Sequence, residues 1–238
     1  MISNQDILAF QSNRGYPVPD APWKYCQEWR DNIFMHWQVD TSFLRDAVPA
    51  ELQLDLFEGK AWISLVAFSV RDMQLRHIPP VSLLSDFHEL NIRTYVVHDG
   101  IPGIYFLTIN AQKLIPVLMA RIFIGLPYRK ARIRRQGNRY RAYRKAHSID
   151  LRYSVKKPIH RSDLDLWLTE RHALFEQRDT DKSLFRIDIH HYPWLLKKAD
   201  VQAKTLTYPF LNGLGGRCPD KVHFSSSVKV LLWGRTQV

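Results

Sequence analysis

A row of polar side chains recurs at every second position of an otherwise apolar segment. The row consists of Glu89, Asn91, Arg93 and Tyr95. Successive side chains of a strand point to opposite faces, so these four are expected to share one face. That face either meets solvent, as in a half-exposed sheet, or lines the inside of a closed barrel. A buried row would mark a site, because buried charges must be paired or hydrogen-bonded.

Such side chains suit a small organic acid or carbonyl compound as ligand. Glu89 would serve as a general acid/base or as a hydrogen-bond acceptor. Arg93 or Arg121 would hold a carboxylate in bidentate geometry. Tyr128 would donate a hydrogen bond to a carbonyl or enolate oxygen. If the row lines a barrel, the expected site is therefore a polar cavity for a small molecule.

The alternative role for Glu89 and Arg93 is a structural ion pair that closes a barrel. Four residues of one strand separate them by about 13 Å, so each is expected to pair across strands instead. His36 and Tyr95 are expected to add polar lining to the same cavity.

A hairpin and a helix are expected to position the row. Residues 87–97 alternate as a strand, and β-branched and aromatic residues suit its pleated surface. Residues 98–103 contain the glycines and the proline typical of a turn. Residues 103–110 are the predicted returning strand. Apolar spacing then predicts a helix over 113–124, provided that Pro116 lies in its first turn.

Short strands dominate the rest of the chain. Ser3, Thr41 and Ser162 are expected to cap three short helices. Strands are predicted over 24–40, 51–57, 61–70, 128–135, 140–146, 149–155, 172–177, 184–191, 197–206 and 222–233. This pattern favours a mainly β protein, either a sandwich or a closed barrel. No linker divides the chain, so a single domain is expected over residues 1–238.

Composition narrows the class of protein. The chain has 238 residues, of which 45% are hydrophobic, enough for a substantial core. No apolar run approaches the roughly 20 residues of a membrane span, so no membrane association is expected. The N-terminus lacks the pattern of a secretory signal. Cys26 and Cys218 show no CxxC spacing, which predicts free thiols in a reducing cytoplasm.

Metal and nucleotide motifs are absent from the sequence. The ten histidines include no HExxH and no Cys/His ligand spacing. His190 and His191 are adjacent, so on a strand they would point to opposite faces. The glycines of residues 213–216 do not follow a strand-to-helix fingerprint. We therefore expect neither a metal nor a cofactor.

The net charge of +11 would attract polyanions without specifying a fold. Residues 128–145 carry nine cationic and no acidic side chains, with Tyr128, Tyr140 and Tyr143 interleaved. Basic strands with aromatic residues are one way to bind single-stranded nucleic acid. The alternative, which we favour, is a solvated outer face of a hairpin whose cationic stems cover apolar surface.

Several motifs, taken together, resemble the YqjF-like family of uncharacterised conserved proteins. They lie between residues 22 and 233 and include F-x-HW, DLFEGKAW, FHELNIRTYV, PGIYFLTINA, GLPY, LTER and IHHYPW. That family is similar in turn to acetoacetate decarboxylase. The resemblance implies a closed antiparallel β-cone with a polar interior over 22–233, preceded by an N-terminal extension over 1–21. It favours the barrel interpretation of the Glu89 row.

The resemblance also shows a departure in the sequence. In the decarboxylase, glycine, an aromatic residue and proline precede two lysines, and the first lysine forms a Schiff base activated by its neighbour, as the decarboxylase illustrates for lysines in general. Here Gly125, Leu126 and Pro127 precede Tyr128 and Arg129, neither of which can form a Schiff base. Lys130 is the nearest lysine, and strand alternation would place it on the face of Tyr128. It could replace the family's lysine only if the register slipped.

The resemblance matches Glu89 to a carboxylate of the family and Arg121 to an arginine of the decarboxylase. Three hypotheses follow. The first is a cavity that binds a small organic acid or carbonyl compound, with decarboxylase-like or proton-transfer chemistry left open. The second is polyanion or nucleic-acid binding through residues 128–145. The third is a catalytically inactive member that keeps only the fold. The sequence leaves a homo-oligomer open.

Overall fold

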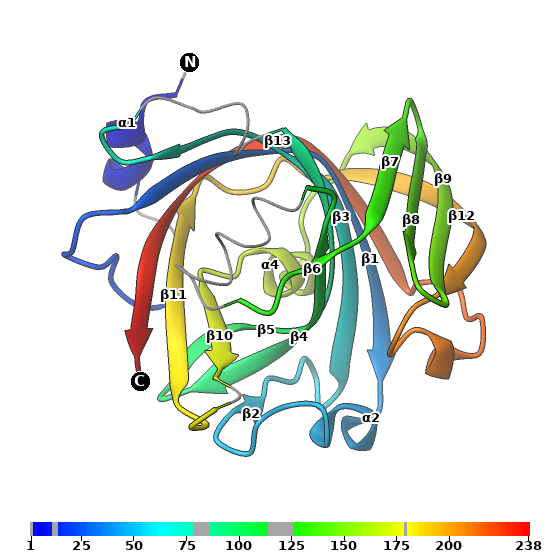
Figure 1. The fold of residues 1–238 in the computed structure, drawn as a ribbon, viewed down its shortest axis with the longest axis horizontal. Helices are drawn as coiled ribbons and strands as arrows, with labels where there is room; N and C mark the ends of the chain where they lie inside the picture. Colours follow the sequence, from blue (N-terminus) through cyan, green and yellow to red (C-terminus); the bar gives the residue numbers. More distant parts are fainter. Residues whose placement is uncertain (1, 11–13, 79–85, 114–125, 179) are drawn as a thin grey trace.

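The computed structural model describes residues 2–10, 14–78, 86–113, 126–178 and 180–238 (Figure 1). The helix expected over 113–124, the predicted site residue Arg121 and Gly125 of the GLPY motif therefore lie essentially outside the described residues. Lys113 alone of that helix is described, and it is not helical.

Strands make up most of the described chain. The helices are α1 (Asn4–Ala9), α2 (Thr41–Arg45), α4 (Asp163–Thr169) and the 3₁₀ helix η2 (Asn212–Leu214). The strands are β1 (Tyr25–Val39), β2 (Gln53–Leu54), β3 (Ala61–Leu75), β4 (Phe87–His98), β5 (Ile101–Ala111), β6 (Arg129–Lys130), β7 (Arg132–Gln136), β8 (Arg139–Arg144), β9 (His147–Pro158), β10 (Ala173–Gln177), β11 (Leu184–His191), β12 (Lys197–Thr207) and β13 (Lys221–Gln237).

Seven strands close into a barrel in the order β1-β3-β4-β5-β10-β11-β13, and β13 pairs again with β1 (Figure 1). This confirms the predicted closed β-barrel. One neighbouring pair of the barrel departs from the antiparallel expectation, because β5 and β10 are parallel. A long crossover through β6–β9 and α4 separates β5 from β10 in the chain, and parallel neighbours require such a connection.

A second layer of four strands, in the order β12-β9-β8-β7, continues from β13. Its inward side chains pack against the outer faces of β1, β3 and β4, for example Ile133, Tyr140 and Ile149 against Leu90 and Ile92. The wall of the barrel at β4 is therefore covered on both sides. This explains why all residues of β4 from Phe87 to Val96 are buried except His88, which is half-buried.

Helix α4 packs inside the barrel, where Leu168 joins the core formed by Val66, Leu174 and Val230 (Figure 1). Ser162 caps it as predicted: the Ser162 hydroxyl accepts from the Asp165 N–H, and the Asp165 carboxylate accepts in return from the Ser162 N–H. Ser3 caps α1 in the same manner. Helix α2 begins at Thr41 with Asp40 as its N-cap, so the prediction of Thr41 as the cap was wrong by one residue.

Two predicted strands are shorter or divided in the structure. The segment 51–57 alternates in sequence, yet only Gln53–Leu54 forms a strand that pairs with β4. The neighbouring Leu52 packs in a separate buried cluster with Val48 and Val96. The strand predicted over 128–135 is divided at Ala131. Its first part, β6, pairs with β5, and its second part, β7, pairs with β8.

Candidate functional site

Glu89 lies on the inner face of β4 and is only 3% exposed. The Tyr128 hydroxyl donates to Glu89 Oε2 at 2.7 Å, and the Asn91 amide donates to Oε1 at 3.1 Å. Burial raises the pKa of the Glu89 carboxyl to about 7, although both hydrogen bonds and the charge of Arg93 act in the opposite direction. Desolvation disfavours the charged form of a carboxyl group and here exceeds the other effects. Glu89 can therefore gain or lose a proton near neutral pH.

Tyr128 lies immediately before β6. Strand β6 pairs with the end of β5, and this end of β5 pairs in turn with the beginning of β4. Burial and the nearby Glu89 carboxylate raise the pKa of the Tyr128 phenol well above its ordinary value of 10. Tyr128 consequently remains a hydrogen-bond donor at neutral pH.

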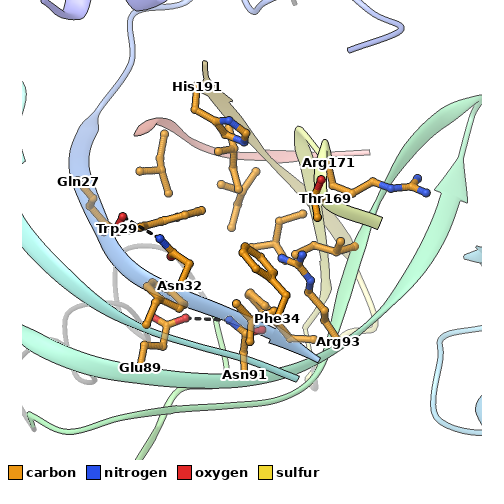
Figure 2. A pocket seen from close by; sticks show the side chains of 18 of the residues that line it. Gln27, Trp29, Asn32, Phe34, Glu89, Asn91, Arg93, Thr169, Arg171 and His191 are labelled. Carbon is orange, nitrogen blue, oxygen red and sulfur yellow. Dashed lines mark hydrogen bonds between the residues drawn. The ribbon is translucent and has the colours of Figure 1, made fainter. Parts of the chain in front are cut away.

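These two residues border a cavity of about 70 Å³ inside the barrel (Figure 2). A single water needs about 10–15 Å³ on this scale, so the space admits several waters or a small organic molecule. The polar and charged side chains that line it are Gln27, Asn32, Glu89, Asn91, Arg93, Tyr128, Thr169, Arg171 and His191. Figure 2 shows Glu89 and Asn91 on one side and His191 on the opposite side.

Arg93 is 8% exposed and forms no salt bridge within the described part of the chain. Burial lowers the pKa of its guanidinium. The group still remains charged at any physiological pH, because the ordinary pKa of arginine is so high. Its Cζ atom lies 5.9 Å from the ring centre of Phe34. Glu89 and Arg93 do not pair with each other, as expected from their spacing along one strand. Glu89 is engaged by Tyr128 and Asn91, and the expected ion pair of Arg93 across strands is not found among the described residues.

Several buried polar atoms around the cavity have no hydrogen-bond partner among the described residues. They are Asn32 Oδ1, Asn91 Oδ1, Arg93 Nε and one terminal nitrogen of Arg171. Buried polar groups in folded proteins are nearly always satisfied by protein, water or ligand. The cavity therefore offers both donors and acceptors to a polar occupant.

His36 and Tyr95 lie elsewhere, which corrects their predicted role as cavity lining. His36 contacts Ser64 at 2.6 Å and His223 at 3.1 Å, and His223 contacts Asp165 of α4 at 2.9 Å. The Tyr95 hydroxyl contacts Ser64 at 2.6 Å and donates to the Leu168 carbonyl at 2.9 Å. Both residues face the barrel interior, but α4 fills that end and takes up their polar atoms.

Lys130 also lies outside the cavity. It is exposed on β6, so the expectation that it shares a face with Tyr128 was wrong. Tyr128 precedes the strand, and the alternation of strand side chains does not extend to it. Arg121, which the sequence placed in the site, lies outside the described residues.

Asn32, Arg171 and His191 line the cavity but were not predicted from the sequence. A β-bulge lies between Arg30 and Ile33, where Asp31 adopts φ +53°. The bulge reverses which positions of β1 face the barrel interior. Before it, the odd-numbered Gln27 and Trp29 line the cavity; after it, the even-numbered Asn32 and Phe34 do. Bulges of this kind re-aim side chains near functional sites. The signal available in the sequence was the Asp31-Asn32 pair, because Asp and Asn adopt positive φ more readily than other non-glycine residues.

Arg171 follows α4, and its guanidinium donates to the Asp55 carboxylate at 2.5 Å and to the Trp167 carbonyl at 2.6 Å. His191 ends β11 and points into the cavity (Figure 2). Burial lowers the pKa of His191 to about 4, so its imidazole is neutral. His190 points the other way, toward the Phe10 carbonyl, as the sequence predicted for two adjacent histidines.

One group of side chains at the edge of the cavity has the composition of a metal site. Glu170, His172 and His191 bring one ligand atom each within 4.8 Å of one another. No metal was expected from the sequence, because it contains no ligand spacing along the chain. Glu170 is the C-cap of α4, His172 immediately precedes β10 and His191 ends β11.

The basic segment 128–145 forms the outer hairpin of β7 and β8. Most of its cationic side chains are exposed or half-buried, but Arg135 packs over the rings of Tyr140 and Tyr153. Tyr140 is fully buried and donates to the Glu89 carbonyl at 2.7 Å. Tyr128 is engaged with Glu89, so only Tyr143 of the three interleaved tyrosines is exposed, at 45%. The arrangement matches a solvated outer face, without the row of exposed aromatic rings that base stacking uses.

The fold places this protein in a known structural class. Its structure resembles an acetoacetate decarboxylase-like enzyme from Sphingomonas wittichii RW1, with a TM-score of 0.65 at 13% identity over 97% of this chain and 99% of that one. It also resembles the enduracididine biosynthesis enzyme MppR in complex with the condensation product of pyruvate and imidazole 4-carboxaldehyde. That match has a TM-score of 0.63 at 13% identity and covers 91% of this chain and 90% of the other. The protein thus has the acetoacetate decarboxylase-like β-barrel fold.

Within that class, residues 26–229 match the DUF2071 family, described as an uncharacterized conserved protein, and the chain belongs to this family. The uncharacterized protein YqjF of Bacillus subtilis (strain 168) is 37% identical over 227 residues, which cover 91% of this chain and 93% of YqjF. The predicted YqjF-like resemblance is confirmed. In the described part of the chain, no helix has the length and apolar character needed to cross a membrane.

Proposed function

We propose that this protein binds a small organic acid or carbonyl compound in the barrel cavity, without a Schiff-base lysine. The observation that carries the proposal is a buried Glu89 carboxyl that shares one cavity with the Arg93 guanidinium, while no carboxylate of the described chain pairs with Arg93. A buried charge without a counter-ion is costly. A ligand carboxylate would supply that counter-ion through charge-assisted hydrogen bonds.

In this proposal each residue has one task. Arg93 holds the carboxylate of the ligand, and the unpartnered amide oxygens of Asn32 and Asn91 accept from its hydroxyl or hydrated carbonyl. Glu89, with a pKa of about 7, exchanges a proton with the ligand, because general acid/base catalysis is most effective near the operating pH. Tyr128 orients the Glu89 carboxyl.

The absence of Schiff-base chemistry has its own support. The positions that follow Pro127 are Tyr128 and Arg129, and no lysine occurs among the described residues that line the cavity. Sodium borohydride reduction in the presence of pyruvate, followed by mass spectrometry, should leave the protein mass unchanged. An adduct on any lysine would contradict this part of the proposal. An acetoacetate decarboxylase treated in parallel serves as the positive control.

A thermal-shift screen against pyruvate, acetoacetate, lactate and small aldehydes tests the binding itself. A ligand at 100 times its Kd stabilises the native state by about 2.7 kcal/mol. The increase in Tm should disappear in Arg93→Met and change its pH dependence in Glu89→Gln. Arg134→Met, which alters an exposed arginine of the outer hairpin, should respond as the unaltered protein does. No shift with any compound, or equal shifts in all variants, would overturn the proposal.

A further inference from the structure

We propose that Glu170, His172 and His191 form a binding site for a divalent transition metal of the Zn²⁺ type at the edge of the cavity. The assignment rests on the protein's own ligand atoms and does not depend on the organic ligand proposed above. One atom from each residue lies within 4.8 Å of the other two.

The fold fixes these residues in place. Strands β10 and β11 are antiparallel, with Ala173 opposite Asp188, and the Ile189 N–H donates to the His172 carbonyl at 2.8 Å. Glu170, the C-cap residue of α4, comes two residues before His172, and its carboxylate reaches the two imidazoles. His172 is 3% exposed and His191 is 1% exposed, and their ring centres are 4.8 Å apart. Two imidazoles are therefore held together within the core.

The hydrogen bonds of both histidines leave the same ring nitrogen available. His172 Nδ1 lies 3.2 Å from the Ile189 carbonyl, and His191 Nδ1 lies 2.7 Å from the Tyr192 carbonyl. A carbonyl oxygen only accepts hydrogen bonds, so Nδ1 carries the proton in each ring and Nε2 carries a lone pair. Metal-binding histidines are oriented in this way, by donating the other ring N–H to a carbonyl or carboxylate.

Glu170 completes the set with an oxygen ligand. Its Oε1 atom accepts from Arg161 at 2.7 Å and from the Trp194 N–H at 3.1 Å, which leaves Oε2 for an ion. Ligand atoms about 2.1 Å from a tetrahedral ion lie about 3.4 Å apart. The group must therefore contract slightly on binding, and the Glu170 side chain, which is 16% exposed, is the member with room to rotate.

The ligand set indicates the kind of ion. Two imidazoles and one carboxylate suit Zn²⁺ and related transition metals, whereas Mg²⁺ and Ca²⁺ prefer oxygen ligands alone. Three protein ligands leave one position of a tetrahedral ion open. Because His191 lines the cavity, an ion held there borders the cavity.

The test uses the full chain without an affinity tag, treated with a chelator and desalted, and titrated with Co²⁺ in the absence of any organic ligand. We expect one Co²⁺ per chain, with the intense visible absorption of tetrahedral coordination, displaced by Zn²⁺. His191→Gln and Glu170→Gln should each weaken the affinity by at least about ten-fold. His160→Gln, which alters an exposed histidine, should not.

Two outcomes would overturn the assignment. One is the absence of a stoichiometric absorption change in the unaltered protein, a result that requires no variant. The other is full affinity retained by both His191→Gln and Glu170→Gln after circular dichroism has shown that they fold. If the buried His191→Gln does not fold, the partly exposed Glu170→Gln decides. Loss of Co²⁺ binding with intact keto-acid binding would separate this site from the proposed function.

Discussion

The buried carboxyl group of Glu89 affects both the chemistry of the cavity and the stability of the fold. Its pKa is raised by burial from 4.5 to about 7 in the folded state. The folded protein therefore binds more protons than the unfolded chain between these two values. Stability from this group is fully present below pH 4.5 and is lost as the pH rises through 7.

Urea unfolding of the protein and of Glu89→Gln, at a series of pH values from 4.5 to 8, measures this effect. We expect the free energy of unfolding of the unaltered protein to fall, relative to the variant, by on the order of 3 kcal/mol. Glutamine does not titrate, so any difference in the free energy of unfolding that is independent of pH does not affect the comparison. Parallel curves would show that Glu89 is not buried as described.

The hydrogen bond from Tyr128 to Glu89 can be tested separately. Removing its hydroxyl in Tyr128→Phe takes away a hydrogen bond that lowers the pKa of Glu89, so that pKa should rise above 7. Carbon NMR of the labelled glutamate carboxyl groups measures it. Tyr143→Phe, at an exposed position of the outer hairpin, should leave the titration unchanged. A pKa of Glu89 that stays the same or falls in Tyr128→Phe would contradict the hydrogen bond.

Strand geometry explains which parts of the site the sequence predicted. Side chains alternate with a fixed period of two, so the alternation in 87–97 correctly grouped Glu89 with Arg93. It could not tell how far the cavity extends along the barrel, and Tyr95 on the same face lies beneath α4. A shared face therefore predicts orientation but not access to the cavity.

The other cavity residues depend on pairing between distant parts of the chain. Asn32 faces the cavity because of the bulge in β1, which reverses the alternation without any change in the apolar pattern. His172 meets His191 through the β10–β11 register, and the barrel closes through β1 and β13. Local patterns do not encode such pairings. The strand pattern left a sandwich or a barrel open, the family resemblance favoured the barrel, and neither predicted which strands are neighbours.

A substitution at Gly103 tests the close approach of β5 and β10, the parallel pair of neighbouring strands in the barrel. A Cβ atom at this position of β5 would lie 2.7 Å from the Ala173 carbonyl and 2.7 Å from the Phe175 ring in β10. Backbone and a buried ring cannot move away easily, so Gly103→Ala should destabilise the protein by about 1–3 kcal/mol. Urea unfolding measures the loss.

Gly234→Ala is the matched control, because that glycine also lies within a barrel strand. The three atoms nearest to its added Cβ all belong to the flexible end of the Lys24 side chain, which can move aside. We therefore expect a smaller effect than at Gly103. Equal losses at the two positions would show that the cost comes from strand glycines in general and not from the close approach of β5 and β10.

Many of the positive charges of the molecule lie on its outer surface, away from the cavity inside the barrel. The net charge is +11, and Arg132 and Arg134 contribute exposed cations on β7. The double substitution Arg132→Gln with Arg134→Gln should lower retention on heparin, because polyanion binding depends on surface charge. Stability should change by less than about 0.5 kcal/mol per position, as at most surface sites.

The same double variant should bind keto acids as the unaltered protein does, if the proposed function is correct. A matched pair of exposed positions outside the hairpin, Lys156→Gln in β9 with Lys182→Gln in the connection between β10 and β11, controls for the loss of charge alone. Equal loss of heparin retention in both pairs would show that the hairpin attracts polyanions only through net charge. Loss of keto-acid binding in the hairpin variant would place the ligand outside the barrel.

The two sides of the Glu89–Tyr128 contact differ in how firmly the backbone holds them. Strand β4 pairs with β3 and β5 and is covered by packed side chains on both faces. Strand β6, which follows Tyr128, consists of two residues paired with β5 alone. Local opening requires little free energy where few contacts are lost. Backbone amide protons of β4 should therefore exchange with heavy water on the time scale of global unfolding, and those of β6 far sooner.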